Sequence, residues 1–254
     1  MGHGLFGTVG LPLSNQADVS TFIDKHNDHI EWHAALHDEW VDGQWVDPSG
    51  VMLAASRHTD GTVLAVPGFL GTPRTSAARF SGVEDDNAVV AEIVDVDGRP
   101  AERFCADSAQ FRDLHILDAD TPTPVVITGL VRHVNVYADA EAFNASPDGE
   151  TIHEKHVALP GYYPIGMMLG GSINPTTMIN AVVDESRTVT VEAIGERVVV
   201  ATVEPVRGFG MSLCWPTDLA PQPEVGNVIH VIAHLTVFIP EIWRQIVERP
   251  THSQ

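Results

Sequence analysis

Short β-prone segments joined by tight turns are the feature that most constrains how this chain can fold. Asp60-Gly61 and Asp97-Gly98 each separate two such segments, and Asp-Gly is a strong signal for a two-residue β-hairpin turn. Glycine suits these turns because it adopts a positive φ angle without steric cost. Gly195-Glu196 can turn the chain in the same way. The predicted hairpins pair Val51–Arg57 with Thr62–Val66, Ala88–Val96 with Ala101–Ala106, and Arg187–Ala193 with Arg197–Val203.

Three further strands are predicted outside these hairpins, at Phe111–Leu117, Val125–Tyr137 and Asn227–Ile239. In the last of them every second residue from Val231 to Ile239 is apolar, which is the period of a strand with one buried face. Many short strands between turn-rich segments favour a mainly β (α+β) fold. We expect an antiparallel β barrel or sandwich of about nine or more strands, two architectures that share this pattern.

One helix is predicted near each end of the chain. The N-terminal helix is expected over Ser20–Val41, with Asp18 or Ser20 as its cap and Gly43 after its end. Its acidic residues share one face and its apolar residues the other, so this amphipathic helix should pack one side on a core. A short C-terminal helix, Glu241–Arg249, is expected between two prolines.

We expect residues 1–254 to form a single globular unit, since β domains often run to about 200–250 residues. The best candidate for a linker is Thr121-Pro122-Thr123-Pro124, because proline cannot donate a hydrogen bond to a sheet and disrupts the interior of a helix. A division into two β halves, 1–120 and 125–254, joined at Thr121–Pro124, therefore stays open.

The chain is strongly acidic. It has 34 Asp and Glu against 14 Lys and Arg, a net charge of −20, and no cluster of basic residues. Binding to nucleic acid or to an anionic membrane surface depends on Lys and Arg replacing counterions. We therefore expect neither nucleic acid nor a membrane as a partner.

The chain is expected to be cytoplasmic. Its first residues lack the basic stretch that precedes the apolar core of a signal peptide, and no apolar run reaches the length of a membrane span. Cys105 and Cys214 lie far apart in the sequence, and without a Cys-x-x-Cys pair they cannot form a cysteine zinc site. Two buried thiols in a reducing compartment are the simplest interpretation, with one long-range disulfide as the alternative.

The sequence contains none of the common catalytic motifs that we tested. It has no Gly-x-Ser-x-Gly elbow, no phosphate-binding Walker loop and no dinucleotide-binding Gly-x-Gly-x-x-Gly after a strand. His153-Glu154-Lys155-His156 differs from the His-Glu-x-x-His zinc motif, because its second histidine is one residue short of the i,i+4 spacing that a zinc-binding helix needs.

Histidine is the unusual residue, with 13 in the chain. Four of them, at positions 26, 29, 33 and 37, would share one stripe on the apolar side of the predicted N-terminal helix. A buried imidazole costs free energy unless its nitrogens find partners, so such a stripe calls for a polar network, a metal, a cavity or a subunit interface. His230 and His234 lie on the other face of the predicted strand that carries Val231.

A metal site is the functional interpretation of these histidines. One helical turn separates His29 from His33 and His33 from His37, which lets two imidazoles bind one divalent transition metal such as zinc. Further ligands are expected from His230, His234 or His153. A metal-bound water ionises near neutral pH, so hydrolase or lyase chemistry would follow, with Glu154 or Asp113 as candidate bases. The alternative is a set of neutral histidines bonded to backbone carbonyls or buried acids.

Two functions are compatible with these sequence features. The first is a non-catalytic module that binds a small apolar ligand or forms a homo-oligomer, because no catalytic motif is present and β barrels often hold one small ligand. The second is the metal-dependent hydrolase or lyase. We rank the binding module first, because structural roles explain every feature except the histidine stripe.

Overall fold

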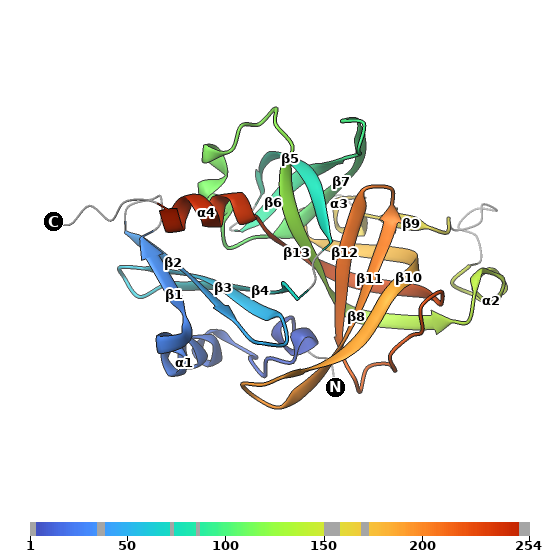
Figure 1. Cartoon of the computed structure of the whole chain (residues 1–254), viewed down its shortest axis with the longest axis horizontal. Helices are drawn as coiled ribbons and strands as arrows, with labels where there is room; N and C mark the ends of the chain where they lie inside the picture. The colour runs from blue at the N-terminus through green and yellow to red at the C-terminus, as the bar shows by residue number, and fades with distance from the viewer. Residues whose placement is uncertain are drawn as a thin grey trace.

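A computed structural model describes residues 4–34, 39–71, 74–84, 87–149, 158–168 and 173–248. It has a nine-stranded sheet, a four-stranded sheet and a few short helices (Figure 1), which confirms the mainly β fold class. The strands of the large sheet are β5 (Thr75–Glu84), β6 (Ala88–Val94), β7 (Pro100–Asp107), β8 (Thr123–Tyr137), β9 (Gly161–Tyr163), β10 (Thr176–Val191), β11 (Glu196–Val206), β12 (Phe209–Pro216) and β13 (Val228–Phe238).

A central ribbon of two long antiparallel strands, β8 and β13, organises the large sheet. The first residues of β8 pair with β5, and residues further along the same edge pair with β12. Strand β13 pairs likewise with β10 and, at Thr236, with β7. The pairings close into two rings that follow one another along the ribbon, β8-β12-β11-β10-β13 and β8-β5-β6-β7-β13. Of the two expected architectures, barrel and sandwich, these closed rings correspond to the barrel, although the β12–β8 and β13–β7 pairings are parallel rather than antiparallel.

The inner face of the ribbon is the core. Val231, Ala233 and Leu235 on β13 are fully buried, as the two-residue period predicts, and Trp215 on β12 is fully buried in the same cluster. Gly129 on β8 leaves room for the neighbouring strand, since a Cβ there would lie 2.4 Å from the Leu213 side chain. Cys105 and Cys214 are buried in two different clusters and form no disulfide with each other.

The small sheet runs in the order β1 (Glu31–Ala34), β2 (Trp40–Val46), β3 (Val51–His58) and β4 (Val63–Phe69). It lies beside the rings, and the end of β4 is fixed to the ribbon. The Phe69 amide donates to Thr128 Oγ1 at 3.0 Å, and Thr236 Oγ1 donates to the Pro67 carbonyl at 2.9 Å. These two threonines lie on the outer face of the ribbon, so the small sheet covers that part of it.

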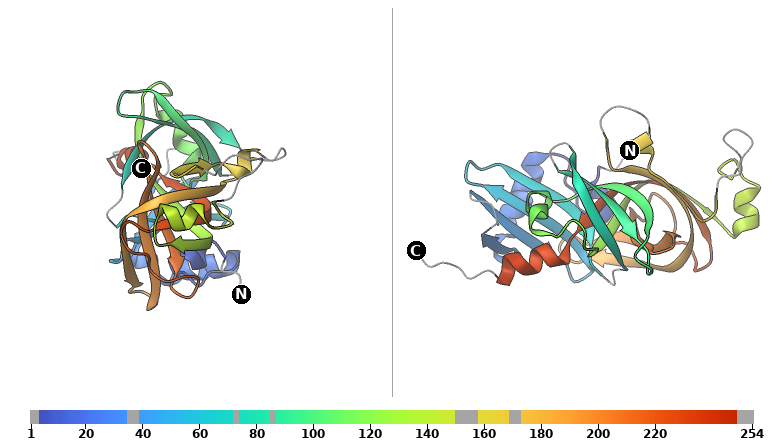
Figure 2. Two further views of the ribbon diagram at one scale, coloured as in Figure 1. Left: turned by 90° about the vertical axis from the view of Figure 1, so that its right-hand side faces the viewer. Right: turned by 90° about the horizontal axis from the view of Figure 1, so that it is seen from above.

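The helices are short. They are α1 (Gln16–Lys25), α2 (Ala140–Asn144), α3 (Ile165–Met168) and α4 (Pro240–Glu248), with 3-10 turns η1 (Phe6–Val9), η2 (Asn27–His29) and η3 (Phe111–Ile116). Helix α4 contacts β1, β8 and η3, whereas α2 lies at the end of the rings far from the small sheet (Figure 2). None of the described helices is both long and apolar enough to cross a lipid bilayer.

The predicted N-terminal helix is confirmed, but its predicted extent, Ser20–Val41, is wrong. Helix α1 ends at Lys25, and Asn15 caps its start by accepting a hydrogen bond from the Asp18 amide. The residues that follow enter η2 and the β1–β2 hairpin, where Trp32 pairs with Gly43. A Cβ on Gly43 would lie 2.5 Å from the Trp32 ring, so the ring fills the space that the glycine leaves. In this segment, packing between two strands outweighs a sequence period that favours a helix.

Two further predictions need correction, whereas the predicted hairpins are confirmed. Phe111–Leu117 is not a strand, because it forms η3 over Phe111–Ile116. Thr123 and Pro124 of the candidate linker are the first residues of β8 and pair with β5. The three predicted hairpins are confirmed as β3–β4, β6–β7 and β10–β11, and the glycines of their turns, Gly61, Gly98 and Gly195, all have positive φ.

Asp47 joins the small sheet to the β10–β11 turn. Its side chain accepts hydrogen bonds from the amides of Ser49 at 2.9 Å and of Glu192 and Ala193, both at 3.1 Å. Only 3% of the residue is exposed. Burial opposes ionisation, but the hydrogen bonds outweigh it and hold the pKa of Asp47 below its ordinary value. One carboxylate therefore satisfies amides from two parts of the fold.

Replacing Asp47 with alanine should lower the free energy of unfolding by about 3 kcal/mol, because three charged hydrogen bonds are lost and the amides of Ser49, Glu192 and Ala193 lose their acceptor. Urea denaturation at pH 7 measures this loss. Asp95→Ala is the matched control, since Asp95 also accepts two backbone amides but within one exposed turn. Equal losses in the two variants would show that Asp47 does not join the sheets.

Candidate functional site

The histidines of the predicted stripe are dispersed. His29 lies in η2, and His33 lies in β1, where its Nε2 is 3.0 Å from Glu31 and its ring packs against Trp243. His37 lies outside the described residues. His230 and His234 lie on β13, on the outer face as the period predicts. Because the helix ends at Lys25, the stripe does not exist as a helical surface.

Among the described residues no three His, Cys, Asp or Glu side chains gather closely enough to hold a metal ion. His153 and Glu154, expected as a ligand and a base, lie outside the described residues with His37. A zinc site that includes those residues stays a prediction.

The structure instead assembles a polar row across three strands. Asn135 on β8 is the register partner of His230 on β13, and His230 is the register partner of Asn180 on β10. All three belong to the outer face of the first ring, with Asn180 fully buried and His230 8% exposed. The row is therefore fixed by sheet register rather than by proximity in the sequence.

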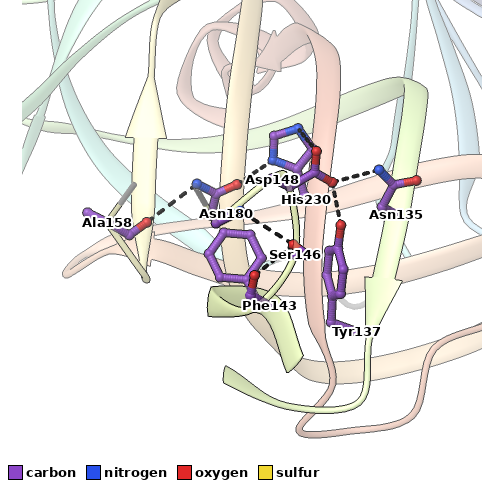
Figure 3. Close-up of polar contacts among 9 residues, drawn as sticks. Asn135, Tyr137, Phe143, Ser146, Asp148, Ala158, Asn180 and His230 are labelled. Atoms are coloured by element: carbon purple, nitrogen blue, oxygen red, sulfur yellow. Dashed lines mark hydrogen bonds and ion pairs between the residues drawn. The ribbon is translucent and has the colours of Figure 1, made fainter. Parts of the chain in front are cut away.

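Asp148 completes this row from above (Figure 3). It follows α2, which the Asp139 side chain caps at the Ala142 amide. Asp148 Oδ2 accepts hydrogen bonds from Asn135 Nδ2 at 2.6 Å and from the Tyr137 hydroxyl at 2.5 Å. Its other oxygen, Oδ1, lies 3.9 Å from His230 Nε2.

Protonation in this network follows from burial and hydrogen bonding. Burial lowers the pKa of His230 and outweighs the opposing effect of the Asp148 charge, and the nearby His133 also lowers it, so the imidazole is neutral near pH 7. Burial opposes the ionisation of Asp148, yet the donors Tyr137 and Asn135 outweigh it and lower its pKa. Burial and the Asp148 carboxylate raise the pKa of Tyr137. The network thus carries an ionised carboxylate beside a neutral imidazole and a protonated phenol.

The hydrogen bond to Asn180 fixes the tautomer of His230. His230 Nδ1 lies 2.7 Å from Asn180 Oδ1, while Asn180 Nδ2 donates to the Ala158 carbonyl at 3.4 Å. Because Asn180 presents an oxygen, Nδ1 must carry the imidazole proton. His230 Nε2 is then a bare acceptor that faces the acceptor Oδ1 of Asp148. Both side chains keep some exposure, 10% for His230 and 23% for Asp148.

His234 belongs to a separate pair. Its Nε2 lies 2.7 Å from Asp107 Oδ2, so its imidazole has a direct partner. Four residues along a strand span about 13 Å, which keeps His234 out of hydrogen-bonding reach of the His230 network. The two β13 histidines named from the sequence therefore serve different carboxylates.

Asn135, Tyr137, Asp148 and Asn180 were missed by the sequence analysis. Each is an ordinary polar residue, and nothing in the linear order shows that three strands align them. The available signal was the position of each asparagine between two apolar residues of a strand, Asn135 between Val134 and Val136 and Asn180 between Ile179 and Ala181. A polar residue in such a position calls for a buried partner.

Asp113, named as a candidate base, lies elsewhere, in η3. It is buried and hydrogen-bonds to Asp42 of β2, whose Oδ1 also accepts from the Ser56 hydroxyl at 2.5 Å. Burial, together with the charge of Asp113, raises the pKa of Asp42 to about 6. The two carboxyl groups lie at the contact between the small sheet and η3, where the hydrogen bond between them helps to hold these two elements together.

Comparison of the chain with models of protein families, with curated protein sequences and with solved structures finds no significant match. The geometry of the His230 network is therefore the basis for the function proposed below.

Asp42→Asn should remove a pH dependence of stability. The folded protein holds the Asp42 proton more tightly than the unfolded chain, so this contribution is full below pH 3.8 and is lost as the pH rises through about 6. The difference between the two pKa values corresponds to about 3 kcal/mol. About 2 kcal/mol of it is lost between pH 4.5 and 7.5, where urea denaturation measures the change, and exposed Asp24→Asn is the control. The assignment would be contradicted if Asp42→Asn lost as much stability between pH 4.5 and 7.5 as the wild-type protein does.

Tyr137→Phe should raise the pKa of Asp148, because the carboxylate loses one of its two donors, and should cost about 1–2 kcal/mol of stability. A pH titration of the Asp148 carboxyl carbon by NMR measures the pKa. Tyr163→Phe is the control, since the Tyr163 hydroxyl accepts from the Ala158 amide and does not contact Asp148. The assignment is refuted by an unchanged Asp148 titration in Tyr137→Phe.

Proposed function

We propose that this protein binds a small ligand on the outer face of the ribbon, between Asp148 and His230. The observation that carries the proposal is the pair of acceptors, Asp148 Oδ1 and His230 Nε2, which face one another at 3.9 Å. Two partly desolvated acceptors without a donor between them are unfavourable, and a ligand that supplies the donor removes that cost.

The inside of the rings supports a ligand less well. The side chains that point inward, such as Ile127, Val199 and Trp215, are fully buried and pack on one another in one cluster. In larger barrels the interior can hold a ligand, whereas here side chains fill that space. The small apolar ligand expected from the sequence is therefore replaced in this proposal by a ligand with a polar group.

A surface groove of about 450 Å³ is a competing location. It lies between η1 and the ends of β11 and β12, and Leu11, Glu196, Arg197 and Pro216 are among its lining residues. Its charged side chains are exposed and of both signs. The groove has the size of a small-molecule site but lacks the buried, convergent polar groups that orient a ligand.

Homo-oligomer formation, a cytoplasmic location and metal-dependent hydrolase or lyase chemistry stay predictions from the sequence. The described residues add no specific support for the metal enzyme, because the histidines placed on one helix are separated in the fold. We therefore keep the binding module as the proposed function.

A fragment screen by NMR tests the site. Ligands should shift the side-chain amide signals of Asn135 and Asn180 and the ring signals of His230, which lie in one row. Asp148→Asn should weaken these ligands at least tenfold, because the charged acceptor is lost, whereas the exposed control Glu141→Gln should leave them unchanged. Fragments that map to the groove at Arg197, or to no common site, would refute the proposed location.

A further inference from the structure

We propose that the group bound between Asp148 and His230 is a primary ammonium ion of an organic amine. This inference rests on the proposed function, because it names the chemistry of the ligand at that same site. Three properties of the described network carry it: the number of acceptors in the gap, the burial of the imidazole, and the sign of the local charge.

The gap needs two donors from one group. Asp148 Oδ1 and His230 Nε2 are 3.9 Å apart, so one nitrogen can lie within about 2.8–3.0 Å of both. A hydroxyl group has a single O–H and can satisfy only one of the two acceptors. An ammonium group has three N–H donors and can satisfy both at once.

The imidazole acceptor is built into the fold. His230 is nine-tenths buried, and Asn180 holds its Nδ1 proton, which directs the bare Nε2 at Asp148. Asn180 itself is anchored at the Ala158 carbonyl and is fully buried. Because the sheet register aligns these residues, the acceptor keeps its orientation when no ligand is bound.

The charge of the network favours a cation. The residues that Asp148 and His230 contact are Asn135, Tyr137 and Asn180, all uncharged, with the exposed His133 ring nearby at 6.3 Å. Among the described residues of this network, the basic neighbours of the Asp148 carboxylate are the His230 and His133 rings, and no Lys or Arg pairs with it. An anionic ligand would be repelled by Asp148, whereas an ammonium ion gains a charge-assisted hydrogen bond.

Water is the natural competitor, since it also has two donors. Water has no charge, however, and gains less from the carboxylate than an ammonium ion does. Tetramethylammonium provides the opposite comparison, because it has the charge but no N–H. Butylammonium, 1-butanol and tetramethylammonium therefore separate the contribution of the donors from the contribution of the charge.

The test is an NMR titration of the wild-type protein with these three probes at pH 7.5, where butylamine is protonated. The His230 ring and the Asn135 and Asn180 side-chain amides report binding. Butylammonium should bind at least tenfold more tightly than either other probe. Asp148→Asn should lose at least tenfold of that affinity, and Glu141→Gln should retain it. The wild-type comparison stands even where a variant fails to fold.

The inference is overturned by 1-butanol or tetramethylammonium binding this site as tightly as butylammonium, and equally by the absence of butylammonium binding. Its failure is distinguishable from that of the proposed function. Other fragments that occupy the Asn135, His230 and Asn180 row would leave the binding site intact and refute only the ammonium ligand. Fragments that all map elsewhere would refute both.

Discussion

The ribbon formed by β8 and β13 is the element on which the rest of the structure depends. A strand pair with one apolar face must bury that face, and the two rings of pairings do so around Val231, Ala233 and Leu235. The opposite face carries polar residues among apolar ones such as Leu130 and Phe238, and it is covered in separate places. Thr128 and Thr236 hold the small sheet there, and the segment after α2 brings Asp148 over His230.

The polar residues on the outer face of the ribbon differ in the partners that they have. The threonines are satisfied by backbone groups of β4, and His234 is satisfied by Asp107. At His230, by contrast, the described network places two acceptors opposite each other. A buried histidine is usually paired, and the imidazole nitrogen that faces the Asp148 carboxylate at 3.9 Å is the position at which we propose that a ligand binds.

The N-terminal histidines show where reasoning from the sequence fails. A run from Ser20 to Val41 with polar and apolar residues in helical order predicts a helix, and the chain forms one only as far as Lys25. Beyond it, Trp32 packs into the space over Gly43 of the facing strand, an interaction between residues that a helix would keep apart. Packing between β1 and β2 therefore decided the structure of this segment, although its local sequence period favours a helix.

The mainly β fold, the three hairpins with their positive-φ glycines, the C-terminal helix and the buried face of β13 were all predictable from the amino-acid sequence. These features depend on local turn geometry and on short periods of apolar residues, which neighbouring residues encode. The closure of the ribbon into two rings, and the row that Asn135, His230 and Asn180 form beneath Asp148, became evident only in the folded protein. Strand order and register join residues as far apart in the sequence as Asp107 and Thr236. The pairing free energy that selects them is a property of the assembled sheet and cannot be read from any one segment.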